Sequence, residues 1–440
     1  MGLENILFIV VLATAVFWFS KNLKTIIRNI NLGKDLDISD NKTERWKKML
    51  MIAIGQSKMV KKPISGLMHI VVYAGFVIIN IEVLEIVIDG ILGTHRVFAA
   101  PLGGFYDFLI ASFEVLALLV LTACVIFLIR RNLLSIKRFG FREMIGWPKT
   151  DANIILIVEV LLMGAFLKMN AADSILQARG VEHYSQAGAF PVSSMIVPLL
   201  EGFSTSSLIV FERVTWWFHI IGIFLFLNYL PYSKHFHIIL AFPSVFYSKL
   251  KPKGEFDNMA SVKKEVELMF DPSADPYAAP AEPEGPIERF GAKDVQDLSW
   301  KQLMDSYSCT ECGRCSEQCP AAQTGKLLSP RKIMMDTRDR LEEVGKNIDQ
   351  HGVEHQDGKS LLGDYIQEEE LWACTTCNAC VDACPIELNP LSIIMDMRRS
   401  LVMEESKVPS ELAGMITNIE NNGAPWQFAQ ADRANWINED

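Results

Sequence analysis

The stretch HIIGIFLFLNYLPYSKHFH, residues 219–237, sets a run of apolar and aromatic residues between a histidine at each end. Such a run predicts a helix long enough to enter a lipid bilayer. At about 100° per residue, an interval of 18 residues makes five whole turns, so His219 and His237 would share one face of a continuous helix. A polar side chain on the inner face of an apolar helix is a candidate functional residue.

Further apolar runs lie upstream in this chain of 440 residues, half of which are hydrophobic. About 20 apolar residues cover about 30 Å of hydrocarbon. The predicted spans are residues 3–19, 67–91, 106–129, 153–169 and 214–231. The first run lacks the basic start and the small-residue cleavage site of a signal peptide, so we expect a retained helix. The sequence thus predicts an all-α, five-helix bundle.

The basic residues predict how these helices are oriented. Eleven Lys and Arg residues lie between the first two spans and six between the third and fourth, whereas the opposite loops hold almost none. Because short cytoplasmic loops are enriched in Lys and Arg, the N-terminus is expected outside and everything after about residue 232 in the cytoplasm of a bacterial inner membrane. The net charge of −10 gives no indication of nucleic-acid binding.

The organisation changes after the apolar region, which we assign to residues 1–250. Residues 251–295 are expected to be a linker, because they contain DPSADPYAAPAEPEGP at 271–286. A helical cysteine-rich domain is predicted at 296–400, followed by a C-terminal extension at 401–440. This domain contains a repeat: CTECGRCSEQCP (309–320) recurs as CTTCNACVDACP (374–385). Ser329 and Asn389, each followed by Pro, predict a helix start after each copy.

Each copy reads C-x2-C-x2-C-x3-C-P, the spacing of bacterial two-cluster ferredoxins. In that arrangement the fourth cysteine of each copy binds the other cluster. The predicted ligand sets are Cys309, Cys312, Cys315 and Cys384 for one [4Fe–4S] cluster, and Cys374, Cys377, Cys380 and Cys319 for the other. Structural zinc is the alternative, but zinc modules usually pair two C-x2-C units across a dozen or more residues. The ninth cysteine, Cys124, is expected to be a small buried apolar residue.

Histidines at the membrane helices suggest haem. The second and fifth helices run in opposite directions, so His69 and His237 are expected at matching depth, where they could bind one haem b iron from both sides. His219 is expected near the outer surface, where its depth-matched positions are Ile79 and Asn80, neither of them a usual haem ligand. A second haem is therefore not supported, and the alternative for His219 is an interfacial residue beside Trp216 and Trp217.

Carboxylates in the predicted spans are costly unless they face a wet cavity. Glu82 and Glu159 are therefore candidates for proton exchange with a quinone, whereas Glu85 and Asp89 are equally well explained as helix ends. Glu82, Asn80 and His219 together form the predicted outer quinone environment or second-haem position. The remaining histidines, His95, His183, His351 and His355, are expected to be solvated.

Two resemblances follow from these motifs. Residues 219–237 resemble the fifth helix of the gamma subunit of membrane-bound nitrate reductase, a five-helix cytochrome b, and His69 matches that family's first ligand on the second helix. WKQLMDSYSCTECGRCSEQCP and NIENNGAPWQFAQADRANW (418–436) resemble iron–sulfur subunits of heterodisulfide-reductase-like complexes, including membrane-bound electron-transfer-flavoprotein:menaquinone oxidoreductases. Fused relatives continue into a domain with CCG motifs. The resemblance therefore implies a separately encoded CCG partner, which the C-terminal extension is expected to contact.

The sequence as a whole predicts an oxidoreductase subunit with no catalytic residue beyond its redox centres. Electrons would pass from a cytoplasmic donor, such as electron-transfer flavoprotein, through two [4Fe–4S] clusters and haem b to menaquinone or ubiquinone in the membrane. Two alternatives remain open: a quinol-oxidising subunit that feeds a cytoplasmic reductase, and a wiring or anchoring subunit without a quinone site.

Overall fold

The computed structural model describes residues 2–273 and 289–438, and these residues form helices and loops without a β-strand. The all-α prediction is therefore correct for the described part of the chain. Most of the proline-rich linker segment predicted at 271–286 lies outside the described residues.

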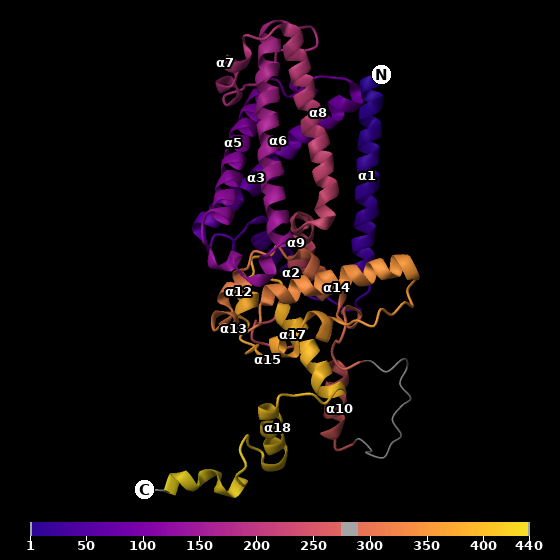
Figure 1. The fold of residues 1–440 in the computed structure, drawn as a ribbon, viewed down its shortest axis with the longest axis vertical. Helices are drawn as coiled ribbons and strands as arrows, with labels where there is room; N and C mark the ends of the chain where they lie inside the picture. The colour runs from indigo at the N-terminus through magenta and orange to yellow at the C-terminus, as the bar shows by residue number, and fades with distance from the viewer. Residues whose placement is uncertain (1, 274–288, 439–440) are drawn as a thin grey trace.

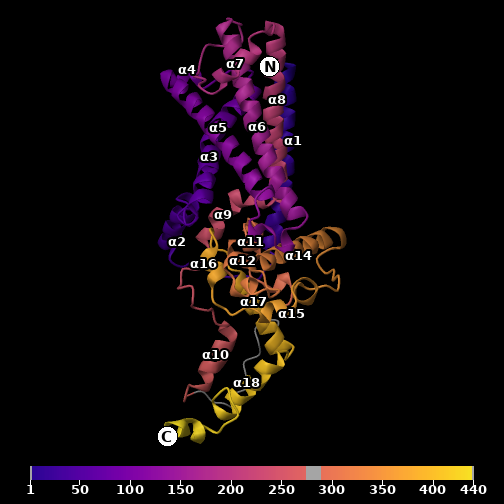
Figure 2. The same ribbon diagram turned by 60° about the vertical axis from the view of Figure 1, so that its left-hand side comes forward.

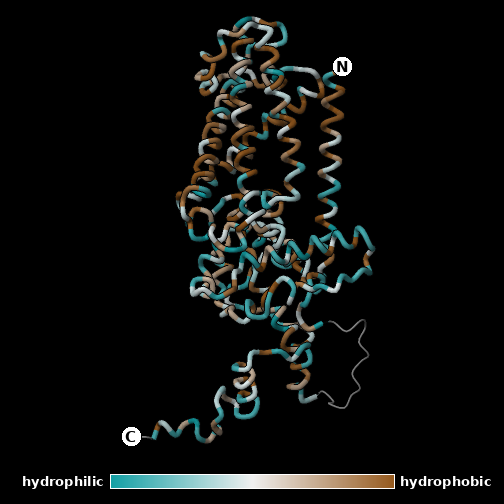
Figure 3. The backbone as a smooth tube through the Cα atoms, viewed as in Figure 1, coloured by the Kyte–Doolittle hydropathy of each residue, from teal (hydrophilic) through white to brown (hydrophobic). Residues whose placement is uncertain are grey.

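Five long helices form an elongated bundle, which we call the apolar bundle (Figure 1). Each is long and apolar enough to cross a membrane. Figure 3 shows hydrophobic residues along most of their length. The N-terminus lies at the distal end of the bundle, and the proximal end meets the cysteine-rich part of the chain. The bundle helices are α1 (Leu3–Ile30), α3 (Pro63–Leu92), α5 (Gly104–Asn132), α6 (Trp147–Ala178) and α8 (Thr205–Tyr229). Short helices α4 (Ala99–Leu102) and α7 (Val197–Leu200) lie in the distal loops.

The helices extend beyond the apolar runs predicted from hydropathy, most clearly in α8. This helix begins at Thr205, where Ser204 caps it by accepting a hydrogen bond from the Ser207 amide. Hydropathy places the start near residue 214 because Glu212 and Arg213 are charged. In the fold, the two charges pair with each other, Arg213 Nη2 lying 2.7 Å from Glu212 Oε1. The pair lowers the cost of burial, so the helix continues through it.

The first helix also serves as a connection to the cysteine-rich part. Its last turns pass beyond the bundle, where Arg28 forms an ion pair with Asp349 at 2.9 Å. Asn29 donates to the hydroxyl of Tyr307 at 3.0 Å and packs against Gly345, where a Cβ would collide with the Asn29 amide. The proximal end of the first helix therefore contributes to the contact with the cysteine-rich part.

The cysteine domain, residues 291–408, packs below the bundle (Figure 1). Ser329 and Asn389 cap their helices through the amides of Lys332 and Ser392, which confirms both predicted helix starts. Burial begins at Ala292 and Val295, a few residues before the predicted boundary at 296. Its helices are α11 (Trp300–Ser308), α12 (Arg314–Gln318), α13 (Pro320–Gln323), α14 (Pro330–His351), α15 (Glu368–Trp372), α16 (Ala379–Ala383) and α17 (Pro390–Arg399).

Short connecting helices complete the interface between the two parts. α2 (Lys42–Met49) and α9 (His237–Phe246) pack together at the proximal end of the bundle, where Arg45 donates to the carbonyls of Phe246 and Ser248. By contrast, α10 (Ala260–Met269) and α18 (Ser410–Asn422) have no buried side chain. Figure 2 shows both extending away from the cysteine domain.

Candidate functional site

The two cysteine loops repeat in backbone conformation as well as in sequence. In the first loop, Glu311 and Gly313 have φ values of 52° and 72°. The equivalent residues of the second loop, Thr376 and Asn378, have φ values of 56° and 59°. These left-handed positions turn successive amides toward a common centre, an arrangement that suits anionic clusters. Glycine is required at 313, because a Cβ there would collide with the guanidinium of Arg331.

The structure groups the cysteines across the repeat. Cys384, from the second motif, lines one cavity together with Cys309, Cys312 and Cys315 from the first. Cys380 also borders this cavity. On the other side, Cys319 from the first motif is a close neighbour of Cys374 and Cys380. Cys384 therefore lies beside the first three cysteines of the first motif, and Cys319 lies beside Cys374 and Cys380 of the second.

The surroundings of the thiols suit cluster ligation. Burial raises the pKa of Cys309 and of Cys380 to about 12, so neither is activated as a free nucleophile. The amide of Leu388 donates to Cys384 Sγ at 3.3 Å, and that of Thr376 donates to Cys374 Sγ at 3.4 Å. Amide hydrogen bonds to the sulfurs are among the factors that tune iron–sulfur potentials. The donor set and its hydrogen bonds thus fit two clusters.

In the described chain, no three His, Cys, Asp or Glu side chains converge closely enough to hold a single metal ion. The thiolates of a cubane each bind a separate iron and surround the cluster, so its ligand set need not converge on one point. All nine cysteines are free of disulfides.

His69 and His237 come together at the proximal end of the bundle, their ring centres 6.5 Å apart and their planes inclined by 41°. His237 directs Nδ1 at the carbonyl oxygen of Lys234, at 3.0 Å. That hydrogen bond fixes the tautomer and leaves Nε2 available as a ligand. The Nδ1 atom of His69 is buried without a hydrogen-bond partner among the described residues. A buried, unpartnered imidazole nitrogen needs an explanation, and a bound group is one.

These distances can be compared with those of an axial imidazole pair. Two imidazole nitrogens bound at about 2 Å from one metal ion, each about 1 Å from the centre of its ring, place the ring centres about 6 Å apart. The observed 6.5 Å is close to this value. The pair therefore fits a metal held between the two rings.

The sequence predicted that His219 lies near the outer surface, but the structure places it inside the bundle. It is buried within α8, directs Nδ1 at the Leu162 carbonyl at 3.0 Å and packs on the ring of Phe166. Asn80 is exposed and its side-chain amide donates a hydrogen bond to the carbonyl of Phe76 in the same helix. The neighbouring Ile79 is the buried residue at this depth of the bundle. The expected grouping of His219 with Asn80 is therefore wrong, because the helical phase turns Asn80 out of the bundle.

Glu82 lines a cavity of about 270 Å³ at the distal end of the bundle. It is 3 % exposed, and its Oε2 has no hydrogen-bond partner among the described residues. The aromatic wall of the cavity includes Phe8 and Trp216, whose rings lie 5.6 Å apart. Neither Asn80, His219 nor Glu159 lines it. Of the predicted outer environment, only Glu82 therefore reaches this cavity.

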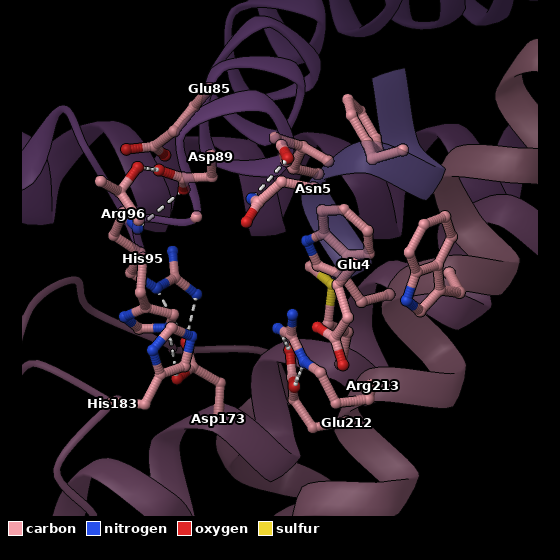
Figure 4. A pocket seen from close by; sticks show the side chains of 18 of the residues that line it. Glu4, Asn5, Glu85, Asp89, His95, Arg96, Asp173, His183, Glu212 and Arg213 are labelled. Atoms are coloured by element: carbon pink, nitrogen blue, oxygen red, sulfur yellow. Dashed lines mark hydrogen bonds and ion pairs between the residues drawn. The ribbon is translucent and has the colours of Figure 1, made fainter. Parts of the chain in front are cut away.

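Two ion pairs lie on opposite sides of the same cavity (Figure 4). Arg96 pairs with Asp173 at 2.6 Å, and Arg213 pairs with Glu212. His95, predicted to be solvated, is instead largely buried and lies 3.1 Å from Asp173, which ties its loop to α6. His183 packs against His95. The carboxylates of Asp173 and Glu212 are thus paired with cations, whereas Glu82 is not.

Two residues that the sequence analysis missed join the cysteine domain to the bundle. Glu311 in the first cysteine loop forms a buried ion pair with Lys234, which lies between the end of α8 and His237. A sequence signal existed: the two copies read CTEC and CTTC, so the repeat itself marks Glu311 as a departure. At the second loop, by contrast, Cys377 is exposed.

Comparison with known proteins supports the redox assignment of the cysteine domain. Residues 308–388 match the family model of a 4Fe-4S dicluster domain. Across 99 % of its length, the chain is 29 % identical to the probable iron-sulfur-binding oxidoreductase FadF of Bacillus subtilis and 26 % identical to the EtfAB:quinone oxidoreductase of Syntrophomonas wolfei. A probable membrane-anchored ferredoxin of Chromohalobacter salexigens is 33 % identical over 33 % of this chain and 24 % of its own length.

The chain spans 61 % and 59 % of the lengths of the first two relatives. Both are named oxidoreductases, in agreement with the prediction of an oxidoreductase subunit. No solved structure matches the chain.

Proposed function

We propose that this chain is the membrane electron-transfer subunit of a quinone oxidoreductase. Electrons from a cytoplasmic donor pass through two [4Fe–4S] clusters and one haem b to membrane quinone. The observation that carries the proposal is the His69–His237 pair, which lies at the end of the bundle that meets the cysteine domain. One chain thus combines ligand sets for two kinds of redox cofactor.

The clusters are assigned by the crossed grouping of the cysteines. Cys309, Cys312, Cys315 and Cys384 hold the first cluster, and Cys374, Cys377, Cys380 and Cys319 hold the second. The first set faces the bundle: Lys58, just before α3, donates to the carbonyl of Cys384 at 3.2 Å. Exposed Cys377 makes the second cluster the entry point for electrons from a partner.

His69 and His237 are the axial ligands of haem b. The two carboxylates of a haem b also need cationic partners, and Arg130 is suitably placed. Its guanidinium donates to Ser65 Oγ at 3.4 Å, one helical turn before His69, and it forms no ion pair with any described residue. A second haem at His219 is not proposed, because no second ligand faces it: among the described residues its ring packs on Phe166 rather than on another histidine.

The proposed setting is a bacterial inner membrane, with the distal end outside and the cysteine domain in the cytoplasm. The distribution of Lys and Arg over the loops supports this orientation. Residues 1–250 form the membrane domain. The linker, expected at 251–295, ends before Ala292, where the core of the ferredoxin domain begins, and the residues after 408 form the contact to a CCG-containing partner. The name of the EtfAB:quinone oxidoreductase supports electron-transfer flavoprotein as donor and quinone as acceptor.

The distal cavity is the proposed quinone-headgroup site. Its volume of about 270 Å³ is near the lower end of ordinary ligand pockets. A quinone ring would lie against Phe8 and Trp216, and reduction to a quinol requires two electrons and two protons. The haem would supply the two electrons one at a time. Glu82, whose Oε2 has no hydrogen-bond partner among the described residues, is placed to hydrogen-bond the quinone oxygen and to transfer one proton. The second proton would come from water, which reaches the cavity past the exposed lining residues Leu3, Glu4 and Thr94.

The test uses the purified complex in lipid vesicles. The haem is reduced with dithionite, a soluble naphthoquinone is added, and reoxidation is followed at the haem α-band. Glu82→Gln should slow reoxidation by about 10²-fold, the usual contribution of a positioned proton donor. Glu159→Gln, which removes a carboxylate from α6 outside the cavity, is the matched control and should have no effect.

The outcomes separate the alternatives. If quinone does not reoxidise the wild-type haem but a quinol reduces it, the chain oxidises quinol. If neither reaction occurs, the chain is a wiring or anchoring subunit. If quinone reoxidises wild type and Glu82→Gln equally fast, the quinone site lies elsewhere.

A further inference from the structure

A buried ion pair joins the two parts of the molecule. The ammonium group of Lys234, in the short turn Lys234–Phe236 after α8, pairs with Glu311 of the first cysteine loop. Their side chains are 7 % and 2 % exposed. The second carboxylate oxygen of Glu311 accepts from Arg338 Nη1 of α14 at 2.8 Å, and Lys234 Nζ also donates to the Pro148 carbonyl at 2.6 Å.

Stability alone does not explain this pair. The desolvation cost of burying two charges commonly equals or exceeds their attraction, and apolar replacements are often as stable. Each carboxylate oxygen of Glu311 faces a cation, because Lys234 pairs with one and Arg338 with the other.

The repeat provides an internal control. Thr376, the equivalent of Glu311 in the second loop, has nearly the same left-handed φ, 56° against 52°. Among the described residues, its side-chain hydroxyl donates only to the adjacent Thr375 carbonyl. The cysteine loop thus adopts its conformation without a charge at this position. The charge of Glu311 serves the contact with the bundle.

Lys234 also contacts the proposed haem ligand. Its carbonyl oxygen lies 3.0 Å from Nδ1 of His237, and its own amide donates to Asp151 Oδ2 at 3.2 Å. Asp151, on α6, in turn accepts from Ser233 Oγ at 2.6 Å. Lys234 therefore contacts the first cysteine loop through its side chain and His237 through its backbone. Asp151 of α6 holds the Lys234 backbone in place through the hydrogen bond to its amide.

We propose that Lys234 and Glu311 are positioning residues that hold the first cluster against the haem and make that cluster the immediate electron partner of the haem. This inference rests on the proposed function. In the transfer, one electron leaves the cluster bound at Cys309, Cys312, Cys315 and Cys384, and one ferric haem iron gains it. No bond forms or breaks and no proton moves.

The experiment compares variants of the full chain in vesicles. Lys234→Met combined with Glu311→Gln removes both charges of the pair. Arg338 keeps its ion pair with Asp339, and Asp151 keeps the hydrogen bonds from Tyr229 and Ser233. Lys234→Arg keeps the charge and is the conservative variant. Lys62→Met is the matched control, because the Lys62–Glu317 pair also joins the bundle to the cysteine domain but is about one third exposed. Iron content, haem α-band intensity and cluster EPR spectra establish that both cofactor types are retained.

The readouts are the rate of haem reduction after flash reduction of the clusters and the magnetic coupling between the first cluster and the haem in EPR. In the double variant the rate should fall by about tenfold or more, as expected when reacting groups are displaced, and the coupling should weaken. Lys62→Met and Lys234→Arg should resemble wild type.

An unchanged rate and coupling in a double variant that retains its cofactors would overturn the inference. The same holds if Lys62→Met slows the transfer equally, because any domain contact would then suffice. If the double variant loses a cofactor, Lys234→Met alone decides by the same readouts. A wild-type chain without haem or clusters would refute the proposed function itself.

Discussion

The imidazoles of His69 and His237 lie with their ring centres 6.5 Å apart at the end of the bundle that meets the cysteine domain. His69 comes from the first turns of α3, and His237 begins α9 after the bundle has ended. The pair depends on the antiparallel course of α3 and α8, which returns the chain to the same depth.

Removing either member of this pair should abolish the low-spin state of the proposed haem. We expect His69→Ala and His237→Ala each to lose the low-spin haem b spectrum, because one axial ligand cannot hold the low-spin state. His219→Ala should retain it, since this histidine packs on Phe166 and is not part of the His69–His237 pair. A pyridine haemochrome assay should find one haem per chain in wild type. Two haems per chain would contradict the arrangement around His219.

The crossed grouping of the cysteines predicts which cluster each fourth cysteine supports. Cys384→Ser should damage the cluster held by the first motif, and Cys319→Ser that of the second. Each should lower the iron content by about half if one of two clusters is lost. EPR of the reduced protein identifies which cluster remains. Cys124→Ala, in α5, should leave iron unchanged, and loss of the same-motif cluster in Cys384→Ser would refute the crossing.

The left-handed positions in the two loops should differ in their tolerance of a side chain. Gly313→Ala places a Cβ against the Arg331 guanidinium at a φ of 72°, and should destabilise the cysteine domain by about 1–3 kcal/mol. Asn378→Ala, at a φ of 59°, should cost only about 1 kcal/mol. Thermal unfolding with the clusters intact measures both. Equal effects would show that the Arg331 contact does not limit position 313.

Arg340 should be a main determinant of stability in the cysteine domain. Its guanidinium is 4 % exposed and pairs with Asp294 at 2.7 Å and with Asp357 at 2.6 Å. Arg340→Met should cost about 3–5 kcal/mol, because these carboxylates lose their cation. Lys407→Met, which breaks an exposed pair with Glu405, should leave the unfolding midpoint unchanged. Urea unfolding at neutral pH measures both effects.

The contribution of Arg340 to stability should decrease at acidic pH. Its hydrogen bonds lower the pKa of Asp357 to about 2, from 3.8. A depressed carboxyl pKa stabilises the fold fully above the unfolded value, and this stabilisation is lost as pH falls toward the folded value. The cost of Arg340→Met should therefore be constant from neutral pH to about 5 and decrease below about 4. Hydrogen exchange at a series of pH values provides the check, and a constant cost down to pH 3 would argue against the Asp357 contribution.

The proposed orientation predicts which side of the membrane a protease reaches. Residues 251–258 connect the bundle to the exposed helix α10 and are themselves exposed. Protease added to inside-out vesicles should release a fragment that carries the cysteine domain, and protease added to right-side-out vesicles should not. Release from right-side-out vesicles alone would invert the topology.

Much of the architecture could be predicted because it depends on local patterns. The five apolar runs predict the five bundle helices, and the Ser-Pro and Asn-Pro starts predict α14 and α17. The ends of the helices could not be predicted in the same way. Hydropathy treats Glu212 and Arg213 as a boundary, but their mutual pairing allows α8 to continue from Thr205.

The candidate site likewise has features that local sequence patterns predict and features that depend on tertiary contacts. The sequence by itself determined the candidate donor residues, because cysteine spacing and the expected depth of His69 and His237 follow from the period of a helix and the direction of each span. Only the tertiary structure decided which groups share an environment. It turned Asn80 outward, buried His219 against α6, left Glu82 without a partner in the distal cavity, and joined Lys234 to Glu311. Such pairings depend on helical phase and on contacts between distant segments, which a local pattern does not contain.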